Sequence, residues 1–113
     1  MKSYNFNVRT DITKSMNAYN KVQSKTRFNT LDAVLLNLIR SFSESNTEFF
    51  MSNKELGQIM VADPSTVQRS VDRLVDTNLI AKKIVYVNNR PKRVLVYDKD
   101  KVGELFGELH GEL

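Results

Sequence analysis

Residues 52–80 decide the fold of this chain, and their sequence is SNKELGQIMVADPSTVQRSVDRLVDTNLI. Ser52 is followed three residues later by Glu55, the pattern of a capping box, in which each side chain accepts a hydrogen bond from the other residue's backbone N–H. A helix is therefore expected to begin there, with its apolar residues facing inward: Leu56, Ile59 and Met60. It should end near residues 61–62, because Pro64 disfavours helical geometry in the residue before it.

A second helix is expected to start directly after a short turn at residues 61–63. Asp63 can cap it, and Pro64 suits its first position, where no intrahelical bond needs the missing N–H. One face is apolar and is expected to pack inward: Val67, Val71, Leu74 and Val75. The opposite face is polar and carries Ser65, Thr66, Gln68, Arg69, Asp72 and Arg73. The stretch thus predicts two helices joined by a tight turn.

Two further helices are predicted before this pair. The clearest apolar stripe follows helical spacing, and Asn29 or Thr30 can cap it: Leu31, Val34, Leu35, Leu38, Ile39 and Phe42. Asp11 can cap an earlier helix with a similar face: Ile12, Met16, Tyr19 and Val22. Residues 48–51 are expected to form a very short strand or an extended link, and residues 4–8 a strand or an arm.

A β-hairpin and a closing helix are predicted after the pair. Residues 82–87 and 93–97 are rich in β-branched and aromatic side chains, and residues 88–91, Asn-Asn-Arg-Pro, are expected to form the turn between them. The tip of this hairpin is basic. Within residues 98–113, four apolar side chains recur at helical spacing: Val102, Leu105, Phe106 and Leu109.

The run Ser-Thr-Val-x-Arg-x-Val-x-x-Leu at residues 65–74, followed by Asn-Leu-Ile at 78–80, resembles the helix-turn-helix of bacterial winged-helix regulators of the MarR type. It also resembles the DNA-binding domains of small plasmid and phage replication or partition proteins. The resemblance covers residues 49–97. It implies an α+β, mostly helical fold in one domain over residues 1–113: a winged helix-turn-helix with its helix pair at about 52–78, a two-stranded wing at about 82–97, and extra N- and C-terminal helices.

Three positions bear on how closely the turn follows this family. The family usually has Gly where this chain has Val61, because Gly takes a left-handed backbone at no steric cost, so the turn is expected to differ in shape here. Gly57 meets the family pattern at the crossing of the two helices. Pro64 removes a backbone donor that other members can offer to phosphate.

Composition narrows the function. The chain has 113 residues, no Cys and one His, His110, so it lacks the parts of a disulfide framework, a thiolate zinc site or a multi-histidine metal site. No nucleophile, base and orienting group occur in a recognisable arrangement, so we expect neither an enzyme nor a bound cofactor. We also expect a cytoplasmic, nucleoid-associated protein without a membrane partner, because no apolar run approaches the roughly 20 residues of a membrane span and no secretory signal is present.

The excess of basic over acidic residues is largest in one segment. Residues 64–97 carry seven Lys or Arg against two Asp or Glu, whereas residues 98–113 carry two against five. The whole chain has a formal net charge of +4. Such clustering favours a polyanionic partner over a merely solvated surface, and together with the helix pair it predicts binding to double-stranded DNA.

The predicted DNA contacts come from the second helix of the pair and from the hairpin. In the first turns of that helix, Gln68 can pair with adenine and Arg69 with guanine, while Arg73 is expected to meet phosphate. The candidate DNA-binding residues are Ser65, Thr66, Gln68, Arg69, Arg73, Lys82, Lys83, Arg90, Lys92 and Arg93. The alternatives are an ordinary solvated helix face and a hairpin kept soluble by its edge lysines.

A homodimer is expected from the two terminal helices, because a winged core leaves their apolar faces without cover. Its predicted interface residues are Ile12, Met16, Tyr19, Val102, Leu105, Phe106 and Leu109; the alternative is that both segments fold back onto their own core.

The function that these features favour is sequence-specific binding of duplex DNA by a small prokaryotic, phage or plasmid transcriptional regulator. Two alternatives stay open: a plasmid or phage replication or partition protein that binds iterated sites, and a winged helix that binds only proteins. The sequence does not identify a small-molecule effector.

Overall fold

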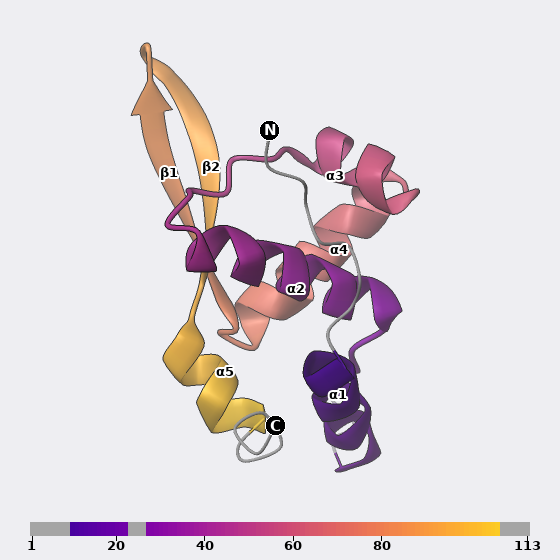
Figure 1. Cartoon of the computed structure of the whole chain (residues 1–113). Helices are drawn as coiled ribbons and strands as arrows, with labels where there is room; N and C mark the ends of the chain where they lie inside the picture. The colour runs from indigo at the N-terminus through magenta and orange to yellow at the C-terminus, as the bar shows by residue number, and fades with distance from the viewer. Residues whose placement is uncertain (1–9, 23–26, 107–113) are drawn as a thin grey trace.

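The computed structural model of the chain describes residues 10–22 and 27–106, which form five helices and one hairpin (Figure 1). The elements are α1 (Thr10–Val22), α2 (Thr30–Glu44), α3 (Asn53–Met60), α4 (Pro64–Asp76), β1 (Ile80–Val87), β2 (Arg90–Tyr97) and α5 (Lys99–Phe106). This order confirms the predicted mostly helical α+β class. The strand or arm expected at residues 4–8 lies outside the described residues. None of the helices in the described ranges is long and apolar enough to cross a membrane.

Helix α2 lies at the centre of the core, where it contacts α1, α4 and β2. A full capping box starts it: the side chain of Asn29 accepts from the backbone N–H of Asp32, and the carboxylate of Asp32 accepts from the backbone N–H of Asn29, both at 2.9 Å. Side chains from every neighbouring element pack against it in one apolar cluster, which includes Leu35, Leu38, Leu56, Val67, Val71, Leu74, Ile80 and Leu95.

Both helices of the central pair begin where the sequence predicts. Ser52 and Glu55 form the expected capping box, and the hydrogen bonds from Ser52 hold the pKa of the Glu55 carboxyl below its ordinary value. Pro64 occupies the first turn of α4, which matches its fixed φ and missing N–H. Asp63 is the N-cap residue of α4, but its side chain makes no capping hydrogen bond.

The turn between α3 and α4 places a valine in the left-handed region. Val61 has φ 53° and ψ 58°, the left-handed conformation that Gly adopts at no steric cost. The Val61 side chain is 92% exposed, and thus little packing offsets its backbone strain. Gly57 lies against this turn, where a β-carbon would collide with the carbonyl oxygen of Ala62. Ile59, expected to face inward, is instead 36% exposed.

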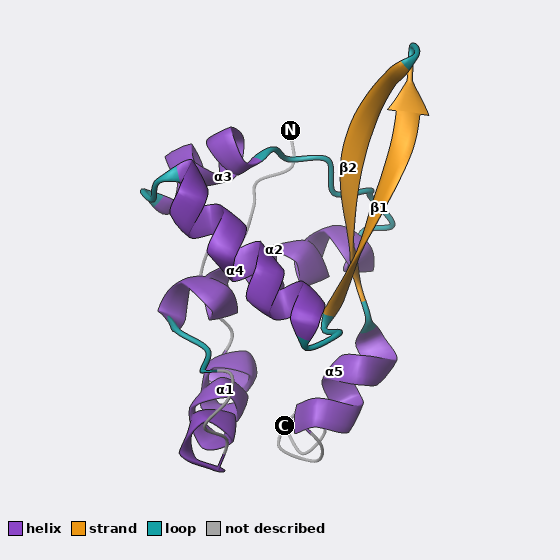
Figure 2. Cartoon of the chain, turned by 180° about the vertical axis from the view of Figure 1, so that it is seen from behind, coloured by secondary structure: helices purple, strands orange, loops and turns teal. Residues whose placement is uncertain are grey.

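The wing is an antiparallel hairpin that projects beyond the helices (Figure 2). Its register runs from Ile80 opposite Tyr97 at the base to Val87 opposite Arg90 at the tip. The turn is shorter than predicted, because the two residues at 88–89 suffice. Both are Asn with positive φ, 52° and 63°, as a two-residue type I′ turn requires.

A backbone hydrogen bond joins the link between α2 and α3 to the wing. The backbone N–H of Leu95 donates to the carbonyl oxygen of Phe49 at 3.1 Å, and the pair forms an isolated antiparallel bridge. Residues 48–51, expected to form a very short strand or an extended link, contain one bridging residue. The Phe49 ring also meets Phe42 of α2 edge-on at 4.8 Å between centroids. The base of the wing is therefore fixed to the helical core.

The two terminal helices pack onto the core of their own chain, which is the alternative to the predicted dimer interface. Four of its predicted residues are buried within one chain: Ile12, Met16, Val102 and Phe106. Tyr19 and Leu105 are half-buried against the same cluster, and the rings of Tyr19, Phe28 and Phe106 lie 5.1 to 6.4 Å apart. Side chains that are already covered offer little apolar surface to a second copy. Leu109 lies outside the described residues.

Replacing Val61 by Gly should raise the free energy of unfolding by about 1 kcal/mol. Relief of left-handed strain contributes roughly 1–3 kcal/mol, and the greater freedom of Gly in the unfolded chain removes about 0.5–1 kcal/mol of that gain. Chemical denaturation of the two proteins measures the difference. Ile59→Gly, two residues earlier and within α3, is the matched control and should lower stability by about 1 kcal/mol. A destabilised Val61→Gly variant would contradict the strain at this turn.

Candidate nucleic-acid interface

Helix α4 is oriented by its buried apolar face. Val67, Val71 and Leu74 are buried, as the sequence predicts, so the polar residues of the opposite face are turned away from the core. Ser65, Arg69 and Asp72 are exposed, and Thr66 and Gln68 are half-buried. In Figure 2, α4 lies in front of α2 on the near side of the molecule. The polar side chains in the first turns of α4 are therefore accessible to solvent.

Asp32 of α2 anchors the middle of α4 by accepting hydrogen bonds in the core. Arg73 donates from Nε to Oδ2 at 2.8 Å and from Nη2 to Oδ1 at 2.9 Å, and the Ser70 hydroxyl donates to Oδ1 at 2.5 Å. Asp32 has no exposed surface, whereas the side chain of Arg73 is 27% exposed. The hydrogen bonds to Asp32 raise the pKa of Arg73 above its ordinary value. The two helices are thereby locked by a charged, bidentate contact.

This contact gives Arg73 a partner within the chain. The sequence placed it on the DNA-facing side as a phosphate contact, but its guanidinium is turned toward α2 and held by Asp32. Asp32 itself was not among the candidate residues. The spacing of Asn29 and Asp32 could have shown that the carboxylate caps α2, but nothing local shows that it also binds a helix 41 positions further on.

Two candidate base-reading side chains of α4 make polar contacts within the chain. Arg69 donates from Nη2 to the Thr66 hydroxyl at 3.1 Å and stays exposed. Gln68 accepts at Oε1 from Nδ2 of Asn53 at 2.6 Å and donates from Nε2 to Asp72 at 2.8 Å. Nothing in the local sequence marks Asn53, the first residue of α3, because its hydrogen-bond partner Gln68 lies on another helix.

The basic residues of the wing lie on both of its faces. Opposite residues in an antiparallel pair share a face and successive residues alternate, so the register puts Lys83, Arg90 and Lys92 on one face and Lys82 and Arg93 on the other. Four of these five residues are exposed, and Arg93 is half-buried. The wing therefore carries positive charge on each side.

Arg93 attaches the wing to the start of α3. It donates from Nη1 to Oδ1 of Asn53 at 2.7 Å and from Nη2 to the carbonyl oxygen of Met51 at 2.8 Å. Both of these acceptors are neutral groups. Burial lowers the pKa of Arg93 from its ordinary value. Arg93 was predicted as part of a basic DNA-binding wing, and the structure places it at an intramolecular contact.

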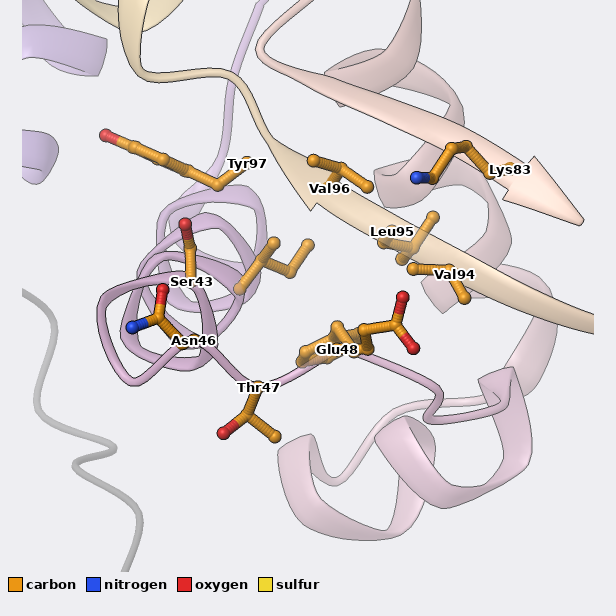
Figure 3. Close-up of a pocket in the computed structure, with 11 residues that line it drawn as sticks. Ser43, Asn46, Thr47, Glu48, Lys83, Val94, Leu95, Val96 and Tyr97 are labelled. Carbon is orange, nitrogen blue, oxygen red and sulfur yellow. The ribbon is translucent and has the colours of Figure 1, made fainter. Parts of the chain in front are cut away.

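A separate cavity of about 260 Å³ lies on the side of the wing that faces the end of α2 (Figure 3). Strand β2 and the segment at residues 43–49 form its walls, and its apolar lining includes Ile39, Phe49 and Leu95. No residue of α4 lines it. Within the described ranges, no cluster of His, Cys, Asp or Glu side chains could hold a metal ion.

Neither a protein-family model nor a curated protein sequence matches the chain. A solved structure does match it: a protein described as a possible transcriptional regulator, from Methanosarcina mazei Go1. The two structures align with a TM-score of 0.56 over 89% of this chain and 78% of the other, at 14% sequence identity. The chain has a winged-helix-like fold. At this identity the likeness concerns the fold alone, and the narrower resemblance to MarR-type regulators stays a prediction.

Replacing Arg73 by Ala should destabilise the fold by about 3 kcal/mol, the lower end of the range for a broken buried pair, because Arg73 is partly exposed. The loss arises because Asp32 would keep its buried charge without its cation. Arg69→Ala, on the same helix but exposed, should change the free energy of unfolding by less than about 0.5 kcal/mol. Urea denaturation of both variants compares them directly. Equal losses would show that the pair with Asp32 contributes nothing particular to stability.

Proposed function

We propose that this chain binds double-stranded DNA through α4 and the wing and acts as a transcriptional regulator. The observation that carries the proposal is the pairing of an accessible polar face on α4 with an adjacent hairpin that is positively charged on both sides. The structural neighbour from Methanosarcina mazei Go1, described as a possible transcriptional regulator, supports the same role.

Helix α4 has the shape and side chains of a helix that reads the major groove. That groove is about 12 Å wide in B-DNA and admits an α-helix. Ser65, Thr66, Gln68 and Arg69 lie in the first two turns, which are the part of a recognition helix that usually meets base edges. Arg69 can pair with guanine and Gln68 with adenine, so this segment can supply sequence preference.

The wing is suited to contact the DNA backbone on either side of a DNA groove. Its two-residue turn keeps the tip narrow, and exposed cations lie on both faces. Lys82 on one face and Lys83, Arg90 and Lys92 on the other can reach phosphates of different strands. Arg73 and Arg93 are omitted from this set because both are engaged within the chain.

Affinity for duplex DNA should fall with salt along a log–log slope no steeper than about −4.5, because five exposed cations each contribute about 0.9. They are Arg69, Lys82, Lys83, Arg90 and Lys92. Titrations of a fluorescent duplex from low to moderate salt give the slope. Arg90→Ala should make it shallower by about 0.9, whereas Lys21→Ala on α1, an exposed control, should leave it unchanged. A flat salt dependence would refute binding through this surface.

Arg69→Ala should cost about 1–3 kcal/mol of discrimination at one base pair, whereas Arg90→Ala should weaken all duplexes about equally. The difference follows from their places on the recognition helix and on the wing. Selection of binding sites from a random pool, followed by competition assays, measures both effects. If Arg69→Ala lowers affinity for selected and random duplexes by the same factor, its role as a base reader is wrong.

A footprint on DNA that flanks the gene tests the regulatory role. A protected site that overlaps a promoter is the expected result. Protection of tandem iterated sites away from any promoter would instead indicate a replication or partition protein.

A further inference from the structure

Four polar side chains form a continuous hydrogen-bonded chain from the wing to helix α4. Arg93 on β2 donates to Oδ1 of Asn53, Asn53 donates from Nδ2 to Oε1 of Gln68, and Gln68 donates from Nε2 to Oδ1 of Asp72. The three distances are 2.7, 2.6 and 2.8 Å. We call these four residues the amide relay. It connects the two parts of the proposed DNA-binding surface, the wing and α4, through the first residue of α3.

The charged groups at the two ends fix the direction of every bond in the amide relay. An arginine guanidinium can only donate, and an ionised carboxylate can only accept. Arg93 therefore donates to the side-chain oxygen of Asn53. The NH₂ group of Asn53 is left to donate to the next residue, which must offer an oxygen. Asp72 in turn requires the NH₂ group of Gln68. Both amides, which could otherwise be turned by 180°, are thus held in one orientation.

The amide group of Gln68 keeps the donor and the acceptor that adenine needs. Its oxygen has two lone pairs and its nitrogen has two hydrogens. Within the described part of the chain, the relay uses one of each. The remaining lone pair can accept from adenine N6 and the remaining N–H can donate to N7, which is the bidentate contact that Gln makes in the major groove.

We propose that Asn53 is a specificity-determining positioning residue: it contacts no base, but with Arg93 behind it, it orients the Gln68 amide to prefer adenine. The inference rests on the proposed function, because it assumes that α4 reads DNA. An amide that is already oriented loses less conformational freedom on binding, and the cost of turning it over penalises other bases. The wing thereby influences which base α4 selects.

Asn53→Asp tests this role with little change in shape. The new carboxylate still accepts from Arg93 but cannot donate to Gln68, whose oxygen loses its partner. Gln68 then lies between two carboxylates that both require its N–H groups, so its orientation is no longer fixed. Position 53 is the first residue of α3, where a negative charge is favourable near the helix N-terminus, so α3 should still form. Asn53→Ala is a second variant that adds no charge.

The experiment compares site preferences rather than affinities, because Asn53→Asp also adds a negative charge that weakens all DNA binding. Sites selected by the wild type are tested in competition against single base-pair changes. Gln68→Ala should lower the preference for adenine about 5- to 150-fold at one base pair. That loss identifies the base pair that Gln68 reads. Both Asn53 variants should lose preference at that same base pair and at no other, and Arg90→Ala, outside the relay, should retain it.

The other outcomes separate this inference from the proposed function. If the Asn53 variants keep the adenine preference that Gln68→Ala loses, Asn53 has no positioning role, while DNA binding by α4 still stands. If Gln68→Ala changes no base preference, Gln68 reads no base and the inference is overturned. If the wild-type protein binds no duplex even at low salt, both the proposed function and the inference are refuted.

Discussion

The buried carboxylate of Asp32 is the interaction on which the geometry of this protein most depends. It accepts from the backbone N–H of Asn29 at the start of α2, from the hydroxyl of Ser70, and twice from Arg73, so that one group caps α2 and holds α4. A carboxylate without exposed surface is tolerated only when its charge is paired and its oxygens are hydrogen-bonded. Asp32 meets both conditions in this arrangement of the two helices. Packing of α4 through Val67, Val71 and Leu74 is non-directional, whereas this contact specifies how the helix is placed.

A second polar contact fixes the wing relative to the helix pair. Arg93 binds Asn53 and the carbonyl oxygen of Met51, and Phe49 is hydrogen-bonded to Leu95 of the same strand. The wing is thus attached to the segment that leads into α3, on the side that continues through Asn53 to Gln68. Both arginines that hold the structure together come from the basic segment, so its charge serves two purposes. Some cations orient the helices, and the exposed ones remain for a polyanion.

Features that depend on residues close together in the sequence were predictable, whereas contacts between residues far apart in the sequence were not. The capping box at Ser52, the proline at the start of α4 and the apolar stripes are local patterns that predicted the helices. The β-branched runs on either side of Asn88 and Asn89 predicted the hairpin. The partners of Arg73 and Arg93 lie 41 and 40 positions away, so the sequence could show that these residues are basic but not that they point inward.

The amphipathic faces of α1 and α5 posed the same problem. Spacing showed that Ile12 and Val102 need cover, but only the packed chain shows that its own core provides it. Val61 shows the opposite case, in which the fold imposes a left-handed backbone that the residue itself disfavours.

A titration followed by nuclear magnetic resonance tests most directly whether α4 and the wing form one surface for duplex DNA. Uniformly ¹⁵N-labelled protein is titrated at low salt with a short duplex, and the shifts of backbone amides are mapped onto the chain. We expect the largest shifts in residues 65–69 and 82–92, with little change in α1 and α5. Shifts concentrated in α1 and α5, or the absence of any shift at saturating duplex, would contradict this proposal.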